Sequence, residues 1–316
     1  MFGNHVSSEK PRMTNGNLVE RIQELKRQRS AVILVHNYQR GEIQDIGDFV
    51  GDSLGLSQEA ARTEADVILF CGVHFMAETA KLINPHKTVL MPDPNAGCPM
   101  ANMVTVRELV EKKKEHPGAA VICYVNSTAA VKAESDICCT SANAAKIMAS
   151  IPADREIIFV PDKHLGRWAA EQLGRKNVIL WDGYCPTHER IIPEEIEIHK
   201  ERHPNALVVV HPECMEDTIA VADHVASTSG ILKFCRQSDA KEFIIGTEMG
   251  ILHRLRKENP GKKFYPVTEF ADCPNMKLTT LQKLVWSLED MVFEIDVPAD
   301  IADKARRAIE KMLELS

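Results

Sequence analysis

The chain has 316 residues, of which 44% are hydrophobic and 26% are charged, and its formal net charge is −7. This composition is typical of a globular protein, and the acidic charge argues against a general nucleic-acid binder. No apolar run is long enough to span a membrane, and residues 1–20 lack the apolar stretch of a signal peptide. Nine cysteines, an odd number, fit a reducing compartment better than a disulfide framework. We therefore expect a cytoplasmic protein with a disordered lead-in and with no nucleic-acid or membrane partner.

Apolar runs alternate with segments of helical spacing along the chain, and this pattern occurs three times. The first run of each repeat predicts a buried strand, at 32–35, 121–124 and 207–210. Second strands are predicted at 66–72, 156–162 and 242–248, and third strands begin near 88, 177 and 263. Strands that alternate with helices predict parallel sheets covered on both faces. Ligands bind beyond the carboxyl ends of such strands, so polar residues there are candidate site residues.

The repeat interval defines the predicted domains. They are residues 18–106, 107–194 and 195–282, followed by a C-terminal helical tail at 283–316. Units this small bury little surface alone, so we expect them to pack as one body. The tail is amphipathic and is expected to complete the packing without chemistry.

Three of the nine cysteines are followed by proline and occur once per repeat. They are Cys98, Cys185 and Cys273, spaced 87 and 88 residues apart. Proline after a ligand cysteine fixes the backbone and removes one donor, and some ferredoxin ligand runs also end in Cys-Pro. Three thiols that meet at one point would form a metal or cluster site with one coordination position open.

Three columns of polar residues keep the same interval. The ends of the first strands align His36, Tyr124 and His211. Two residues later the register aligns Tyr38, Asn126 and Glu213, a phenol, an amide and a carboxylate, which suits an asymmetric substrate. Fifteen residues further come Ser53, Ser141 and Thr228, each before a helical segment, where we expect N-caps. Helix N-termini attract anions, so three such ends around one centre would hold phosphate and carboxylate groups.

The cysteine spacing distinguishes between the sites that thiolates build. Structural zinc usually has four protein ligands, with cysteines paired at short spacing, and no CxxC pair occurs here. Radical chemistry with adenosylmethionine would need three closely clustered cysteines. The spacing therefore favours a [4Fe-4S] cluster whose open iron acts as a Lewis acid in a dehydration. His188, three residues after Cys185, is either a contact within this site or a solvated loop residue.

Several segments together resemble the quinolinate synthase family, NadA, of NAD biosynthesis. They are VHNYQ with Tyr38, GDSLGLS with Ser53, GVHFMAETAKLINPHKTVLMPDPNAGCPMA with Cys98, YVNST and HPEC. The resemblance implies three similar three-layer α/β/α domains, with parallel sheets, around a pseudo-threefold axis. It implies an oxygen-sensitive [4Fe-4S] cluster with three cysteine ligands. It also implies a reaction that condenses iminoaspartate with dihydroxyacetone phosphate to quinolinate, with phosphate and water as the other products.

The resemblance also implies a role for each candidate residue. The cluster ligands would be Cys98, Cys185 and Cys273. Tyr38 would be a general acid/base, Glu213 the base for proton removal and tautomerisation, and His188 would assist them. The carboxylates and the phosphate would be bound by His36, Ser53, Tyr124, Asn126, Ser141, His211 and Thr228. Some members carry a redox-switch cysteine near the last ligand, and Met276 stands in that place here, which argues against such a switch.

Two other functions stay open at this point. One is a different hydro-lyase that uses an open-iron cluster, which its product would distinguish. The other is a non-enzymatic cluster or zinc sensor, which has no need for the asymmetric column of Tyr38, Asn126 and Glu213. The expected partners are the two small anionic substrates. Transient handover from the enzyme that makes the labile imine is a further hypothesis.

Overall fold

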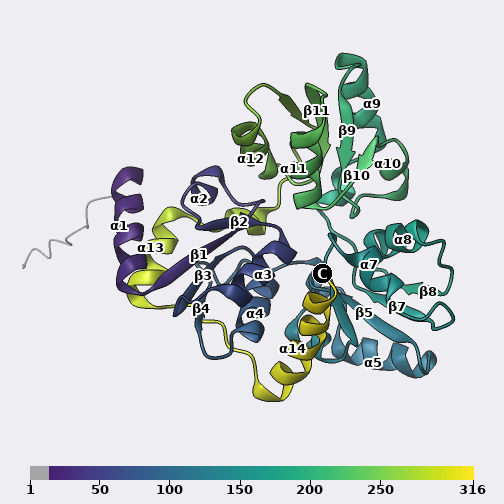
Figure 1. Cartoon of the computed structure of the whole chain (residues 1–316), viewed down its shortest axis with the longest axis horizontal. Coiled ribbons are helices and arrows are strands. Elements are labelled where there is room, and N and C mark those ends of the chain that lie inside the picture. The colour runs from purple at the N-terminus through teal and green to yellow at the C-terminus, as the bar shows by residue number, and fades with distance from the viewer. Residues whose placement is uncertain (1–13) are drawn as a thin grey trace, which may run out of the picture.

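The computed structural model describes residues 14–316, so residues 1–13 of the predicted lead-in lie outside the described residues. Its remaining part was predicted wrongly, because residues 15–20 are helical and belong to α1 (Asn15–Gln28). The strands form three four-stranded sheets, and every pairing within them is parallel. Figure 1 shows the three sheets with their helices as three lobes around a common centre. The predicted fold class, three similar three-layer α/β/α domains around a pseudo-threefold axis, is confirmed.

The strand order is the same in the three sheets. The first sheet is ordered β2 (Phe49–Gly51), β1 (Ala31–His36), β3 (Val67–Cys71) and β4 (Thr88–Leu90). The second is ordered β6 (Ile137–Cys139), β5 (Ala120–Tyr124), β7 (Ile157–Val160) and β8 (Val178–Leu180). The third is ordered β10 (His224–Val225), β9 (Leu207–Val210), β11 (Glu242–Gly246) and β12 (Lys263–Pro266). We call each sheet, with its flanking helices and the Cys-Pro turn that follows it, the first, second or third lobe.

The prediction of three strands per repeat was one strand short. The missed strands β2, β6 and β10 are edge strands of two or three residues. Segments this short carry no alternation of apolar and polar residues, and their pairing comes from the neighbouring strand rather than from their own pattern.

The helices occupy equivalent places in the three lobes. Those that connect the strands are α2 (Gly41–Gln44), α3 (Ser53–Arg62) and α4 (His74–Ile83), then α6 (Ala129–Ala133), α7 (Ala144–Ala149) and α8 (Lys163–Gln172), and last α10 (Glu216–Ala220), α11 (Thr228–Gln237) and α12 (Ile251–Glu258). Helices α5 (Val106–Glu115) and α9 (Pro193–Arg202) lead into the second and third lobes. A 3₁₀ turn follows each of the three cysteines, at η1 (Met100–Asn102), η2 (His188–Arg190) and η3 (Pro274–Lys277). None of the helices in residues 14–316 is long and apolar enough to cross a membrane.

An aspartate makes the same contact in every lobe. Its carboxylate accepts a 2.8 Å hydrogen bond from a backbone N–H fifteen residues earlier, in the pairs Asp48–Ile33, Asp136–Val121 and Asp223–Val208. Hydrogen bonds to a charged group are stronger than neutral ones, so each carboxylate fixes the central strand against the turn that leads to the edge strand. These aspartates are a further column of the internal repeat.

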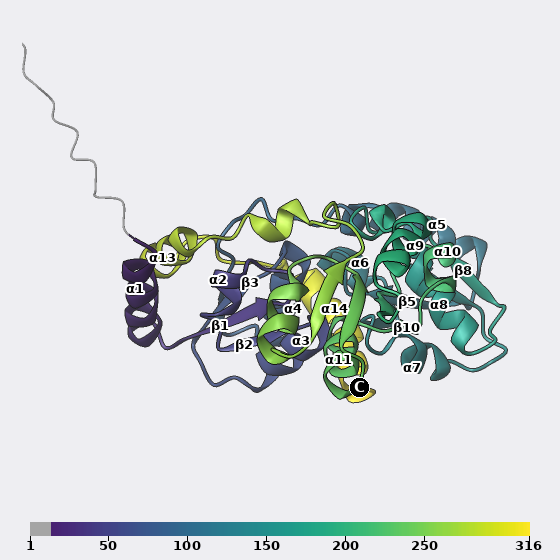
Figure 2. The same ribbon diagram turned by 90° about the horizontal axis from the view of Figure 1, so that it is seen from above.

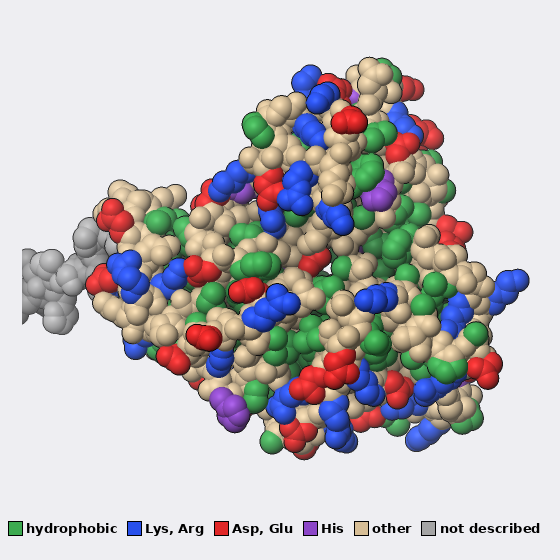
Figure 3. Space-filling model, viewed as in Figure 1, with side chains coloured by type: hydrophobic (Ala, Val, Ile, Leu, Met, Phe, Trp, Pro, Cys, Tyr) green, Lys and Arg blue, Asp and Glu red, His purple; other side chains and the backbone are tan. Residues whose placement is uncertain are grey.

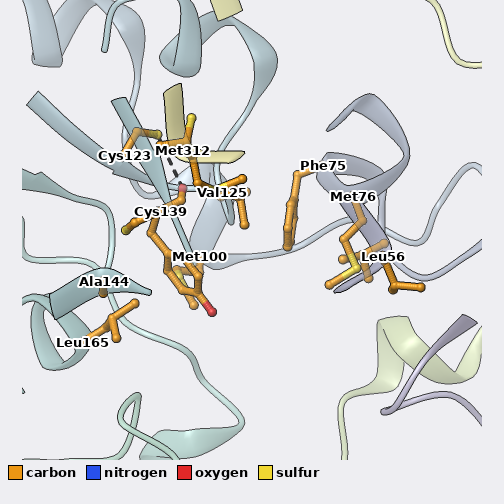
Figure 4. Packing of buried hydrophobic residues seen from close by; sticks show 14 of the residues in the cluster. Leu56, Phe75, Met76, Met100, Cys123, Val125, Cys139, Ala144, Leu165 and Met312 are labelled. Atoms are coloured by element: carbon orange, nitrogen blue, oxygen red, sulfur yellow. Dashed lines mark hydrogen bonds between the residues drawn. The ribbon is translucent and has the colours of Figure 1, made fainter. Parts of the chain in front are cut away.

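One apolar core extends through the three lobes. Figure 4 shows Phe75 and Met76 of α4 facing the part of this core formed by Met100, Val125 and Cys139. Burial of each large apolar side chain contributes roughly 1.5–3 kcal/mol, so these contacts strongly stabilise the junction between the first and second lobes.

The C-terminal segment is helical, as predicted, and it joins parts of the molecule that are distant in sequence. Helix α13 (Leu281–Asp290) packs beside α1 (Asn15–Gln28) on the first lobe, as Figure 2 shows. Helix α14 (Ala299–Glu314) packs against α4 of the first lobe and α6 of the second. The predicted domain bounds stay a prediction.

Candidate functional site

A cavity of about 240 Å³ lies where the three lobes meet. Figure 3 shows a small opening between the lobes at this place. All thirteen residues predicted from the sequence line this cavity: His36, Tyr38, Ser53, Cys98, Tyr124, Asn126, Ser141, Cys185, His188, His211, Glu213, Thr228 and Cys273. The three repeats therefore direct their polar strand ends and their Cys-Pro turns toward one centre.

The three Cys-Pro thiols occupy turns of the same construction. None of the nine cysteines, all of which the structure describes, forms a disulfide. Burial raises the pKa of Cys98 to about 12, and it also raises the pKa of Cys185 and of Cys273. The backbone N–H groups two and three residues after each cysteine act in the opposite direction, because they stabilise the thiolate. Three free soft donors, each with N–H groups directed at its sulfur, suit an iron–sulfur cluster.

A chain of hydrogen-bonding groups starts at the Tyr38 phenol. Its oxygen lies 2.6 Å from Oγ1 of Thr247 and accepts a 3.2 Å hydrogen bond from Oγ1 of Thr228. Oγ1 of Thr247 also lies 2.9 Å from Nε2 of His188. On the other side of that imidazole, Nδ1 lies 2.8 Å from Oε2 of Glu213. A phenol and a carboxylate from different lobes are thus connected through one hydroxyl and one imidazole.

The second lobe holds the other oxygen of Glu213. The Tyr124 hydroxyl donates a 2.5 Å hydrogen bond to Oε1, and Nδ2 of Asn126 donates a 3.5 Å hydrogen bond to the same atom. Burial opposes ionisation of this carboxyl, but His188 and the Tyr124 hydroxyl hold its pKa below the ordinary value. Burial, reinforced by the Glu213 charge, raises the pKa of Tyr38 and of Tyr124 well above the ordinary value. Near neutral pH the site therefore contains an ionised carboxylate between protonated phenols.

Two strand-end histidines are neutral donors. Burial lowers the pKa of His36 and of His211 to about 3. In each ring Nδ1 accepts a 3.2 Å hydrogen bond from the backbone N–H two residues later, which leaves the proton on Nε2. Nε2 of His211 lies 3.1 Å from Oγ of Ser141. These rings offer hydrogen bonds to a ligand rather than positive charge.

The predicted N-caps were wrong in position. Ser53 and Thr228 are the first residues of α3 and α11, and the caps are the residues before them, Asp52 and Ser227. Ser141 lies three residues before the start of α7. In α3 and α11 the preceding residue can also cap the helix, and its side chain accepts the backbone N–H, whereas α7 begins without a side-chain cap hydrogen bond. The hydroxyls in the predicted column are consequently free from capping and line the cavity.

The sequence analysis missed three polar residues at the site. Arg190 and Glu248 line the cavity, and Thr247 bridges Tyr38 and His188. Glu248 is fully buried, accepts the N–H groups of Cys273 and Gly250, and lies 2.7 Å from Nζ of Lys277.

A signal for two of these residues was present in the sequence. Strand pairing places Gly246, Val160 and Cys71 in one column, so Thr247 and Glu248 follow the second strand of the third repeat. Polar residues recur there in the second repeat, where Asp162 is fully buried. Comparison of the columns after the second strands would have found both.

The chain is similar to known proteins over nearly its whole length. A family profile described as Quinolinate synthetase A protein matches residues 20–314. Proteins named quinolinate synthase are similar to it. The one from Geobacter metallireducens is 56% identical over 294 residues, which cover 93% of this chain and 96% of the relative. The one from Thermodesulfovibrio yellowstonii is 55% identical (94% and 98% covered), and the one from Methanosarcina barkeri is 52% identical (95% and 98% covered). The resemblance drawn from the motifs is confirmed.

Proposed function

The chain belongs to the quinolinate synthetase A family, and from this premise we propose that it is an enzyme of NAD biosynthesis that condenses iminoaspartate with dihydroxyacetone phosphate to quinolinate. Phosphate and water are the other products. The observation that carries the proposal is the convergence on one cavity of three Cys-Pro thiols and a connected phenol, imidazole and carboxylate. The names of the relatives support the same reaction.

Cys98, Cys185 and Cys273 would hold a [4Fe-4S] cluster with one iron open to substrate. The fit is supported by the donor set, because one free thiol comes from each lobe and each has backbone N–H groups to stabilise negative sulfur. Ligation would displace the protons that these thiols hold in the metal-free chain. When bound, the cluster would supply a Lewis-acid iron that polarises a substrate hydroxyl or carboxylate.

Tyr38 and Glu213 would move the protons of the reaction. The phenol of Tyr38 is protonated and can donate to a leaving hydroxyl, whereas the carboxylate of Glu213 can accept a proton during tautomerisation. The Thr247 hydroxyl and the His188 ring lie between them, and once Nδ1 of that ring aligns with Oε2 of Glu213, 2.8 Å away, a proton lost at one end can be replaced from the other. His188 would also keep the Glu213 charge in place while the cavity excludes water.

The two anionic substrates would be bound by hydroxyls, neutral imidazoles and helix ends. Ser53 and Thr228 lie at the N-termini of the ten-residue helices α3 and α11, which carry partial positive charge. His36 offers Nε2–H, and Arg190 adds a full positive charge to the lining. Ser141, His211, Tyr124 and Asn126 complete the predicted binding set on the side of the second and third lobes.

An oxygen-sensitive cluster and nine free thiols suit a reducing compartment, and we place the enzyme in the cytoplasm. Iminoaspartate is a labile imine, so an oxidising enzyme that forms it from an amino acid must supply it nearby. A transient handover between the two enzymes follows from this chemistry.

The test is to purify the chain without oxygen, measure iron and sulfide, and assay the same sample for quinolinate. We expect about four irons and four sulfides per chain, held by cysteine ligands, together with quinolinate. Cys98→Ser should lose the cluster, whereas the matched control Cys235→Ser, a buried cysteine of α11, should keep it. A full cluster without quinolinate would favour a different hydro-lyase, and zinc without sulfide would favour a sensor.

A further inference from the structure

Three side chains at one edge of the cavity are arranged to hold a single metal ion. Cys185, His188 and Glu213 each present one ligand atom that lies within 4.8 Å of the other two. Among residues 14–316, this is the only set of three or more cysteine, histidine, aspartate or glutamate side chains whose ligand atoms all lie that close together. The three Cys-Pro thiols are farther apart, which suits a multi-iron cluster rather than one ion. We propose that the cluster-free chain binds one zinc ion between Cys185, His188 and Glu213.

The ring of His188 presents the correct nitrogen. Its Nε2 atom is occupied by Thr247 at 2.9 Å, whereas Nδ1 has no hydrogen-bond partner although the residue is 1% exposed. Nδ1 lies 2.8 Å from Oε2 of Glu213, but the two atoms are not aligned for a hydrogen bond. A buried nitrogen and a carboxylate oxygen this close, without an aligned hydrogen bond, form an arrangement that a cation between the two would satisfy.

The surrounding structure also positions the other two ligands, Glu213 and Cys185. Tyr124 and Asn126 hold Oε1 of Glu213, so Oε2 is the free carboxylate oxygen. Cys185 lies three residues before the 3₁₀ turn η2, which begins at His188, and the two side chains present their ligand atoms within 4.8 Å of each other. Partners that orient a ligand in this way typically change metal affinity by about 10–100-fold.

The donor set selects zinc. A thiolate, an imidazole and a carboxylate suit a borderline-soft ion, whereas calcium and magnesium prefer oxygen ligands alone. Three protein ligands leave the fourth tetrahedral position for water. Zn–N and Zn–O bonds of about 2.0–2.2 Å place tetrahedral ligand atoms about 3.3 Å apart, so the observed 2.8 Å must open by about half an ångström.

The zinc site and the cluster would exclude each other because both use Cys185. This consequence rests on the proposed function, whereas zinc binding by the cluster-free chain does not. A bound zinc ion would also remove His188 and Glu213 from the acid/base chain. The site would therefore act as a competing state in which the chain is inactive and closed to cluster insertion.

The test uses the full chain, stripped of iron and sulfide under anaerobic conditions. Cobalt is titrated first, because a tetrahedral Co²⁺–thiolate site gives a near-ultraviolet charge-transfer band, and zinc is then used to displace it. We expect one cobalt per chain with that band. Cys185→Ser, His188→Gln and Glu213→Gln should each weaken zinc binding by roughly 100-fold or more, at least the loss seen when an orienting partner is removed.

Cys98→Ser and Cys273→Ser are the matched controls, since each removes a Cys-Pro thiol outside the proposed zinc site. We expect both to bind zinc within about threefold of the parent chain. Equal loss in all three serine variants would place the ion on the three thiols and overturn the proposal, and so would unchanged affinity in Cys185→Ser. Thermal unfolding of each metal-free variant identifies any that fails to fold, in which case the remaining two ligand variants decide.

A second measurement tests whether bound zinc prevents assembly of the cluster. Zinc-loaded chain should take up less iron and sulfide during cluster reconstitution than metal-free chain. His188→Gln keeps all three thiols but weakens zinc, so it should restore uptake in the presence of the same zinc concentration. Failure of His188→Gln to restore uptake would overturn the exclusion. Neither readout depends on quinolinate, so failure here and failure of the proposed reaction are distinguishable.

Discussion

Replacement of Thr247 by valine tests the connection between the phenol and the imidazole. Valine has nearly the shape of threonine but lacks the hydroxyl that lies 2.6 Å from the Tyr38 oxygen and 2.9 Å from Nε2 of His188. Tyr38 keeps its hydrogen bond from Thr228, whereas His188 loses its partner on Nε2. Since His188 is 1% exposed, water does not readily replace that partner.

A buried polar group left without a partner costs about 1–3 kcal/mol. If the whole loss is expressed in the transition state, kcat falls about 5- to 150-fold. KM should change little, because Thr247 does not line the cavity. The assay is anaerobic quinolinate formation, with iron and sulfide content measured on the same sample.

Thr247→Ser is the control, because it keeps the hydroxyl and loses one methyl group. It should retain activity within about threefold, in contrast to Thr247→Val. If both variants lose activity equally, Thr247 acts through packing. If Thr247→Val is fully active with a full cluster, the connected chain is not used for proton movement and the reasoning is refuted.

Three further predictions follow from the same contacts. Glu213→Gln should keep the cluster but lower turnover by about 100-fold or more, because it removes a proton acceptor; near-normal turnover would exclude Glu213 as the base. Met312→Ala, at a fully buried position of α14, should lower the free energy of unfolding by about 2–5 kcal/mol in a denaturant titration, whereas the exposed control Glu310→Ala should have little effect. Burial lowers the pKa of His36 to about 3, so the unfolded chain binds a proton between pH 6.5 and 3 that the folded chain does not. The wild-type melting temperature should therefore fall as pH drops below about 6.5, and fall less steeply in His36→Gln; parallel profiles would contradict the neutral assignment.

The internal register was strong enough to predict the fold and the residues that line the cavity. His36 and Tyr124 end β1 and β5, His211 directly follows β9, and parallel strands of similar lobes direct these positions to one centre. The register works because each lobe must keep its central strand and its Cys-Pro turn in the same relation to that centre. Differences within a column, such as Tyr38 against Glu213, then mark chemistry rather than structure.

What the sequence did not predict depends on contacts between distant segments. Thr247 follows a strand that was predicted, but its importance comes from Tyr38, which is 209 residues away, and from His188. The caps shifted by one residue because Asp52 and Ser227 compete with their neighbours for the same backbone N–H groups. Neither kind of choice is decided by local propensity or periodicity.

The third lobe contributes one partner to every contact between lobes in the acid/base chain. Tyr38 of the first lobe reaches Thr247 and Thr228, and Tyr124 and His188 of the second lobe reach Glu213. One apolar core extends through all three lobes, and at the junction of the first and second lobes α14 adds further packing against both. Apolar packing fixes that pair largely independently of pH or ligand, whereas the polar contacts with the third lobe change with the protons and substrates they hold. Because the third lobe carries Glu213 and one Cys-Pro thiol, the groups proposed for proton transfer and for cluster binding depend on the same polar junction.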